Sequence, residues 1–185
     1  AFSSQVQAVA VGWQIYALTH SAAALGFVGL AQFLPMVAFI FPAGHAADQH
    51  DRRRIVITCQ AIEALAAAFM ALASFAHFLA PGMIYGLVAL FGVCRAFEMP
   101  AQQTFLPSLV PTSVFPRAAA LSSSLFQVAS IAGPSLGGLL YGLGAGVCYA
   151  LCAAGFAIAA LATTSMTLRF PARPRQPATL AAVFG

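Results

Sequence analysis

The sequence predicts an all-α integral membrane protein, built as a bundle of six transmembrane helices. Of its 185 residues, 61% are hydrophobic and only 6% are charged, whereas a soluble domain carries about 25% charged residues. So few charges cannot cover a surface that faces water, so lipid must be the solvent for most of it. Apolar runs of about 20 residues, the length that crosses a bilayer, alternate with short polar segments.

The apolar runs divide the chain into a helical unit over residues 1–168 and the start of a cytoplasmic linker over 169–185. The expected spans are about 1–18, 24–43, 55–79, 83–100, 117–141 and 147–168. Four prolines between residues 100 and 116 favour a helix end and a loop in that stretch. The first residue is not Met and lies in an apolar run, so we expect the natural protein to be longer.

The charges predict the orientation of the chain. The net charge of +4 could suggest a nucleic-acid partner. The arginines, however, lie at the ends of apolar runs, which is a membrane pattern, so we expect the bilayer and no nucleic acid as a partner. With alternating spans, one side receives Arg52, Arg53, Arg54, Arg117, Arg169, Arg173 and Arg175. Every Trp and Tyr lies at the other ends of the spans. The positive-inside rule then places segment 44–54 and tail 169–185 in the cytoplasm, with the spans in a bacterial inner membrane.

The segment after the second span has a specific spacing of glycine, acid and arginine. It contains Gly44, Asp48 and the run Arg52, Arg53 and Arg54. Gly44 allows a tight exit from the span, and Asp48 is placed to accept hydrogen bonds or meet a helix N-terminus. Taken alone, the arginines could simply anchor the segment at anionic headgroups.

This spacing resembles the signature loop between helices two and three of major facilitator superfamily transporters. The resemblance implies that the acid and the basic residues form a cytoplasmic latch against the other half of the protein. The sequence departs from the pattern at Gln49, where the family usually has Arg, and at Asp51, where it usually has Gly. An acid at the second position also occurs in the drug and siderophore exporter branch that includes the enterobactin exporter.

The fifth predicted span carries a glycine–proline motif of Gly133, Pro134, Gly137 and Gly138. Gly133 and Gly137 share a helix face, and small residues allow helix backbones to approach closely. Pro134 removes one backbone donor and bends the helix. The pattern fits a kinked packing helix and also looks like the fifth-helix motif of antiporter-type members of the same superfamily, which favours export over uptake.

Three ionisable residues inside the spans are candidates for transport and coupling. Glu63 lies in the third predicted span, and Arg95 and Glu98 lie three residues apart in the fourth. A charge within a span is costly unless it faces the bundle or a wet cavity, so each is a functional hypothesis. Arg95 and Glu98 are expected to pair, and Glu63 to bind and release a proton. The alternative interpretation of Arg95 and Glu98 is a structural ion pair near the membrane interface. The alternative interpretation of Glu63 is a solvated carboxyl in a vestibule that faces the cytoplasm.

The sequence gives no sign of catalysis, a metal centre or a cofactor. Its four cysteines lie in apolar runs without a CxxC pair, and we expect reduced packing residues. The sequence also lacks a nucleophile elbow, a phosphate-binding loop and a pair of catalytic carboxylates, which argues against a membrane enzyme.

The resemblance implies the N-terminal half of a twelve-helix transporter, with three-plus-three inverted repeats and alternating access. Its partners would be the missing C-terminal six-helix half, protons and a small amphipathic substrate: a drug, a siderophore or a metabolite. The sequence leaves open a six-span protein that forms a homodimeric carrier or serves as a non-transporting scaffold.

Overall fold

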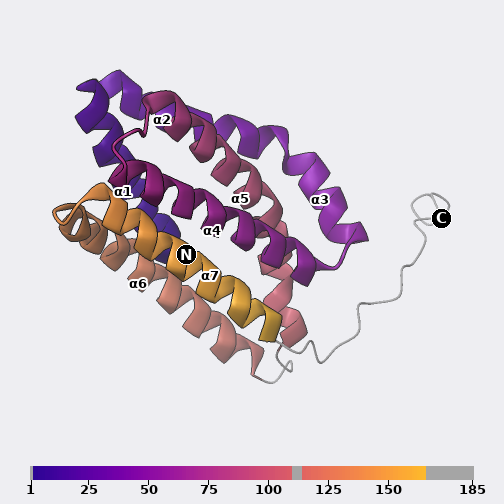
Figure 1. Ribbon diagram of the computed structural model, residues 1–185. Coiled ribbons are helices and arrows are strands. Elements are labelled where there is room, and N and C mark those ends of the chain that lie inside the picture. The colour runs from indigo at the N-terminus through magenta and orange to yellow at the C-terminus, as the bar shows by residue number, and fades with distance from the viewer. Residues whose placement is uncertain (1, 110–113, 166–185) are drawn as a thin grey trace.

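The computed structural model describes residues 2–109 and 114–165, without the side chains of Asp48 and of residues 103–109. Within these residues every regular element is an α-helix, so the all-α prediction is confirmed. The helices form one elongated bundle (Figure 1). They are α1 (Phe2–Thr19), α2 (Ala22–Ala38), α3 (Ile40–Gln49), α4 (Arg52–Phe75), α5 (Pro81–Leu109), α6 (Phe115–Tyr141) and α7 (Ala145–Ser165).

Length and composition identify three or four spans in the described residues. The segments Arg52–Phe75, Pro81–Gln102 and Ala145–Ser165 are each long and apolar enough to cross a membrane, and α2 with the start of α3 makes a fourth when the bent pair is counted as one. Helices α1 and α6 fall short of that test because their interiors carry glutamines and serines. The expected count of six therefore needs support beyond composition.

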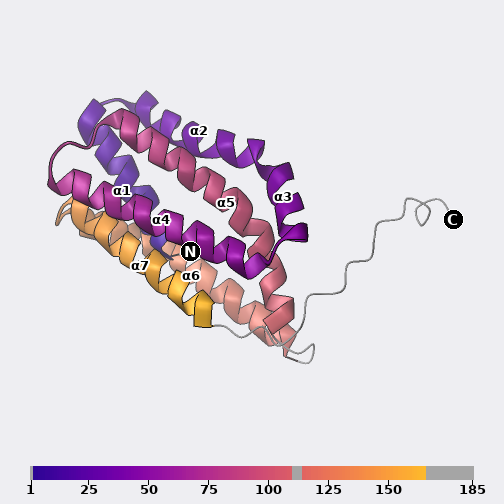
Figure 2. The ribbon, with the colours of Figure 1, turned by 45° about the vertical axis from the view of Figure 1, so that its right-hand side comes forward.

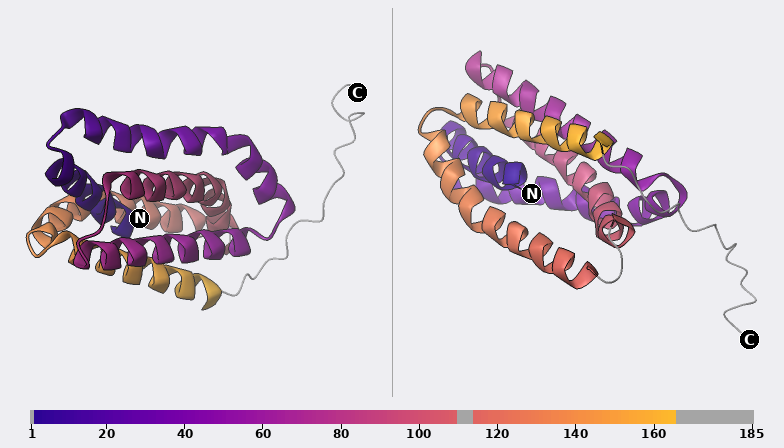
Figure 3. Two further views of the ribbon diagram at one scale, coloured as in Figure 1. Left: turned by 45° about the horizontal axis from the view of Figure 1, so that its top comes forward. Right: turned by 90° about the horizontal axis from the view of Figure 1, so that it is seen from below.

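The second predicted span, 24–43, is broken in the structure. Helices α2 and α3 meet at Phe39 with a bend of 50°, and Figures 2 and 3 show the pair as a bent arm along one side of the bundle. Pro42 explains the position of the break. It has no N–H for the carbonyl of Ala38, and its ring would clash with that carbonyl in a continuous helix. Pro35, in contrast, lies inside α2 without ending it.

Two segments expected to be loops are largely helical. Residues 44–49, expected to leave the membrane as a loop, continue α3 to Gln49. Helix α5 runs on past Pro100 to Leu109, although the prolines favoured a helix end near residue 100. Membrane helices tolerate proline where neighbouring groups satisfy the freed backbone. The linker 169–185, the end of the sixth expected span, Pro111 and the arginines at 169, 173 and 175 lie outside the described residues.

The bundle is held together by three extensive helix pairs. Helix α4 packs along α7, α2 along α5, and α1 along α6, and Figures 1 and 2 show α4 and α7 next to each other over their length. The core lies where α1, α4, α5 and α7 meet. Its largest fully buried apolar residues are Ile15, Met70 and Ile84.

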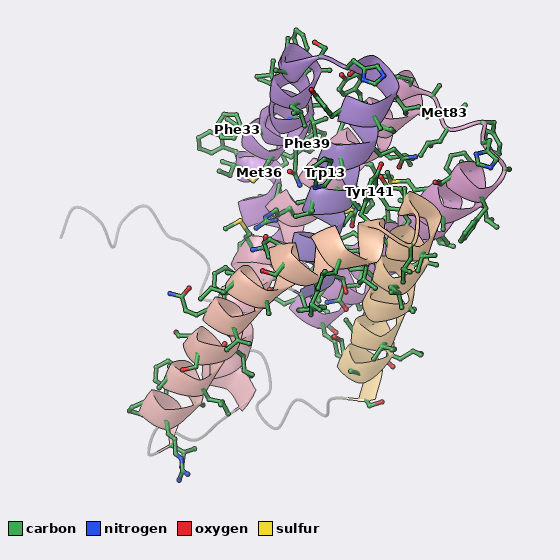
Figure 4. All side chains as sticks on the ribbon, turned by 90° about the vertical axis from the view of Figure 1, so that its left-hand side faces the viewer. Trp13, Phe33, Met36, Phe39, Met83 and Tyr141 are labelled. Carbon is green, nitrogen blue, oxygen red and sulfur yellow. The ribbon has the colours of Figure 1, made fainter. Side chains whose placement is uncertain are left out.

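The two ends of the bundle differ in chemistry, as the sequence indicated. The helix directions put Arg52, Arg53, Arg54 and Arg117 at one end. The opposite end carries the tryptophan and the tyrosines, and there the rings of Trp13 and Tyr141 stack with centroids 6.2 Å apart (Figure 4). The chain turns there with left-handed residues at His20, His77 and Gly144, a backbone conformation common just after a helix end.

Glycines set the closest helix approaches. A Cβ on Gly133 of α6 would lie 2.6 Å from Cβ of Gln5 in α1, and one on Gly137 would lie 3.2 Å from the backbone of Val6. In α5, a Cβ on Gly92 would collide with the backbone carbonyl of Gln32 in α2. Gly138 faces open space. The motif glycines Gly133 and Gly137 therefore let α6 lie against α1, and Gly138 does not take part in that contact.

We expect Gly133→Ala to destabilise the protein and Gly138→Ala to stabilise it. Overpacking typically costs about 1–3 kcal/mol, whereas replacing an exposed helical glycine with alanine gains up to about 1 kcal/mol. Thermal unfolding of the two variants in detergent measures the difference. Equal shifts for both would contradict the close packing of α1 against α6.

Candidate functional site

The main cavity lies inside the bundle and brings together the three ionisable residues singled out from the sequence. Its volume is about 330 Å³, and Glu63 of α4 and Arg95 and Glu98 of α5 all line it. The remaining walls come from α1, α2, α6 and α7 and are mostly apolar. Further polar lining is supplied by Ser4, Gln5, Gln7, Gln32 and Gln102. A cavity with apolar walls and a few converging polar groups is the usual form of a small-molecule site.

The two carboxyls occupy different surroundings. Glu63 is only 6% exposed. Glu98 is half-buried and accepts a hydrogen bond from Gln102 Nε2 at 3.2 Å through Oε2. Its other oxygen, Oε1, is buried and has no hydrogen-bond partner among the described residues. The site therefore holds one deeply buried carboxyl and one that is partly satisfied.

Arg95 does not form the expected ion pair. The structure has no contact within 4.0 Å between Arg95 and Glu98, and the one ion pair in the described residues joins Arg54 and Asp51. Arg95 is exposed, yet it lies close enough to act electrostatically on both Glu63 and Glu98. It lines the same cavity as both carboxyls from an exposed position.

Two cysteines lie one helical turn from the carboxyls. The sequence analysis interpreted these cysteines as packing residues. Cys59 of α4 and Cys94 of α5 are both free and buried. Cys59 lies four residues before Glu63, and Cys94 lies four residues before Glu98. Residues four apart share a helix face, so this repeated Cys-x-x-x-Glu spacing was a sequence signal that α4 and α5 face each other.

The glutamines within the helices do not act alike. Gln5 and Gln32 line the main cavity. Gln14 lies at the aromatic end, donates to Ser74 Oγ at 3.4 Å and lines a second hollow beside His77. Gln127 is exposed on α6. Gln5 and Gln32, like Gln7 and Gln102, are placed to bond a substrate in the main cavity, and Gln14 and Gln127 are not.

Each arginine after α3 has its own partner. Arg52 Nε donates to the carbonyl of Ala47 at 3.3 Å, which satisfies the end of α3. Arg54 is 87% exposed and has its Nε 4.0 Å from Asp51 Oδ2. Asp51, which departs from the family pattern, accepts from the backbone N–H of Arg53 at 3.0 Å and caps the start of α4. That capping role was expected of Asp48, whose side chain lies outside the described structure.

Arg53 makes the long-range contact of this group. Its Nε donates to the carbonyl of Thr163 at 3.1 Å, and a terminal nitrogen donates to the carbonyl of Thr164. The last carbonyls of a helix have no intrahelical partner, and a cation there also complements the helix dipole. Arg53 therefore caps the C-terminal end of α7 from the start of α4.

The chain matches a known family over nearly its whole length. The model of the major facilitator family described as transmembrane secretion effector matches residues 1–181. The chain belongs to this family. Membership places it among multi-pass membrane transporters rather than enzymes, and no group of His, Cys, Asp and Glu in the described residues could hold a metal ion.

Curated relatives carry transport names. The chain is 30% identical to macrolide efflux protein A of Streptococcus pyogenes over 139 residues, which is 75% of this chain and 34% of that protein. It is 23% identical over 71% of its length to the staphyloferrin A transporter of Staphylococcus aureus, covering 34% of it. It is 24% identical over 61% of its length to a Na⁺, Li⁺, K⁺/H⁺ antiporter of Planococcus maritimus, covering 28% of it. The chain thus spans about a third of these relatives, and no solved structure matches.

We expect Arg53→Gln to destabilise the protein and Arg54→Gln to leave stability nearly unchanged. Arg53 satisfies two terminal carbonyls with a charged donor, which is typically worth about 1.5–3 kcal/mol per bond, whereas the exposed pair of Arg54 is worth at most about 1 kcal/mol. Thermal unfolding in detergent measures the stability of the two variants. The rate of proteolysis after residue 160 in the folded proteins measures how firmly the end of α7 is held. An unaffected α7 end in the Arg53 variant would show that the cap does not hold it.

Proposed function

We propose that this chain is part of a secondary active transporter that uses proton entry to export a small amphipathic molecule. The observation that carries the proposal is the meeting of Glu63 and Glu98, from two helices, with Arg95 in one cavity inside an apolar bundle. Ionisable groups within a membrane are costly and mark ion or substrate pathways.

The proposed architecture is the N-terminal half of a twelve-helix fold with three-plus-three repeats. Suppose that α1, α2–α3 and α4 form one repeat and that α5, α6 and α7 form the other. Helix α1 then corresponds to α5, α2–α3 to α6 and α4 to α7, so exchange of the repeats converts the α2–α5 pair into the α6–α1 pair. The same exchange maps the α4–α7 pair onto itself. These are the three most extensive pairs in the bundle, as a two-fold relation between repeats requires. The division also counts α1 and α6 as spans.

The C-terminal half is the proposed partner of α6. Residues 120–128 of this helix are all exposed and mix apolar side chains with Ser122–Ser124 and Gln127. Such a mixed face suits a protein neighbour or a wet cavity better than hydrocarbon. Coverage of only about a third of the relatives agrees with a partner that lies outside this chain.

The cavity supports an amphipathic substrate. Phe91, Phe126 and Phe156 offer apolar contact, and Gln5 and Gln32 offer hydrogen bonds. A drug, a siderophore or another secreted metabolite combines both kinds of surface. The names of the relatives, which include macrolide efflux and staphyloferrin A transport, agree with the drug and siderophore exporter branch.

Export is favoured over uptake by the motif of α6 and by the relatives. Gly133, Pro134, Gly137 and Gly138 match the pattern of antiporter-type members, and one relative is named as a cation/H⁺ antiporter. In the proposed cycle the segment Gly44, Asp48, Arg52, Arg53 and Arg54 closes against the C-terminal half as a cytoplasmic latch. Arg52 and Arg53 supply caps within this chain, which leaves the exposed Arg54 as its candidate contact residue.

We expect Glu63→Gln and Glu98→Gln in the complete transporter to abolish proton-driven efflux. Each removes one group that can change charge in the cavity, so loss of about tenfold or more is expected. Efflux of a radiolabelled macrolide from proteoliposomes under an imposed pH gradient measures this. Glu63→Asp, which keeps the carboxyl, is the control, and normal proton-driven efflux in both Gln variants would remove these residues from coupling.

We expect the arginine end of the bundle to face the cytoplasm of a bacterial inner membrane. A cysteine placed at His50, in the turn between α3 and α4, should react with an impermeant maleimide only after cells are opened. A cysteine at Leu143, in the exposed turn before α7, should react in intact cells. The four native cysteines are buried and give a low background. Labelling of both sites from one side would contradict the six-span topology.

A further inference from the structure

The lining of the main cavity is divided chemically between its helices. The charged groups, which we call the charged wall, are Glu63, Arg95 and Glu98, and all come from α4 or α5. Helices α1 and α2 contain no charged residue. They contribute neutral polar groups instead, which we call the uncharged wall: Ser4, Gln5, Gln7 and Gln32. Neither α1 nor α2 packs directly against α4, so the uncharged wall lies across the cavity from Glu63.

The uncharged wall has hydrogen-bonding groups that the protein leaves unused. Gln7 is only 5% exposed, yet its amide has no hydrogen-bond partner among the described residues. Its amide atoms are not sealed off, as Oε1 of Gln14 is, so they open to the cavity that Gln7 lines. Gln102 of α5, in contrast, already donates to Glu98. An unpaired buried amide is costly, which indicates that Gln7 is placed to hold a group from outside the chain.

The cavity changes from polar to apolar along its length. On α1, Ser4, Gln7 and Val11 line it at spacings of three and four residues, so they share one helix face. The polar part of this face lies toward the arginine end of the bundle. Toward the other end the lining includes Phe91 of α5, whose ring stacks on Phe156 of α7 with centroids 6.4 Å apart. A bound amphipathic molecule would place its polar part against the uncharged wall.

Hydroxyl groups are the ligand chemistry that fits this wall. A hydroxyl both donates and accepts, and each glutamine amide offers two donors and an acceptor. A ligand carboxylate would find no cation on α1 or α2 and would face the carboxyls of Glu63 and Glu98. A ligand ammonium group has no acceptor for the amide N–H groups and would gain more at the charged wall. A neutral hydroxyl satisfies both halves of the amide.

We propose that the uncharged wall binds a neutral, hydroxyl-rich group of the exported molecule, such as a sugar or another polyol. The charged wall is then left to bind protons. This inference rests on the proposed transport function and narrows its substrate class, because it disfavours molecules that carry several carboxylates. Substrate and proton share one cavity but are held by different helices.

The test compares three phenyl glycosides. Phenyl β-D-glucoside has free hydroxyls, its tetra-O-methyl ether has no hydroxyl donor, and phenyl β-D-glucuronide adds a carboxylate. Calorimetric titration into the complete transporter in lipid nanodiscs, without a proton gradient, measures the three dissociation constants. The glucoside should bind about tenfold or more tightly than either analogue, because a site built to bond hydroxyls rejects a ligand that lacks them. No binding of the glucoside, or equal affinity for either analogue, would overturn the proposal.

Glutamine variants locate the preference for hydroxyls. Gln7→Leu removes the amide at similar size, so the ratio of the affinities for the glucoside and its methyl ether should fall about fivefold, the effect of one hydrogen bond. Gln32→Leu, at a half-buried position, makes the same test on α2 if Gln7→Leu does not fold. Gln14→Leu is the matched control, because Gln14 lies on α1 outside the main cavity. An unchanged ratio in the folded Gln7 or Gln32 variant, or a lost preference in Gln14→Leu, would overturn the proposal.

The inference and the proposed function fail differently. Glu63→Gln leaves the uncharged wall intact and should keep the preference for hydroxyls, and its loss there would place the hydroxyls at the charged wall instead. If Glu63→Gln and Glu98→Gln lose proton-driven efflux and the wild type shows no preference for hydroxyls, the uncharged wall fails and the coupling role stands. If both variants export normally and the preference holds, the coupling role fails and the uncharged wall stands.

Discussion

The fold depends on one constraint: an ionisable side chain surrounded by hydrocarbon must find its partners inside the protein. Glu63 and Glu98 come from different helices, and they share one cavity away from lipid because α4 faces α5. Cys59 and Cys94 lie one helical turn before these carboxyls on the same two helices. The apolar packing of α4 on α7 then fixes the outer side of α4. The cavity and the bundle thus follow from a single requirement.

Much of the fold could be read from the sequence because lipid imposes long apolar helices. Apolar length and arginine spacing predict helices and the two chemically distinct ends. The break at Phe39 was missed because membrane helices often contain proline, so Pro42, four residues beyond Ala38, did not stand out as the residue that interrupts the helix. The segment after Gly44 remained helical because a glycine permits an exit without requiring one. The continuation of α5 past Pro100 shows the same override of local preference by context.

The candidate site was predicted in its charged members and missed in its neutral ones. Glu63, Arg95 and Glu98 stand out because charges in spans are costly. The role of Arg53 in capping α7 was also missed, because it depends on which helix lies beside α4, and no local pattern specifies that neighbour. The expected pairing of Arg95 with Glu98 followed from their spacing, but the structure has no ion pair between them, and Arg95 lines the cavity from an exposed position.

The cap that Arg53 places on α7 bears on how the chain assembles. Arg53 is synthesised some 110 residues before the carbonyls that it holds. Its guanidinium stands at the bilayer surface with unused donors while the later helices are still being made. When α7 enters the membrane, the carbonyls of its final turn accept hydrogen bonds from Arg53, which is already in place. This contact gives α7 a defined depth and a defined neighbour. A helix made late in this chain is thereby positioned by a residue made much earlier.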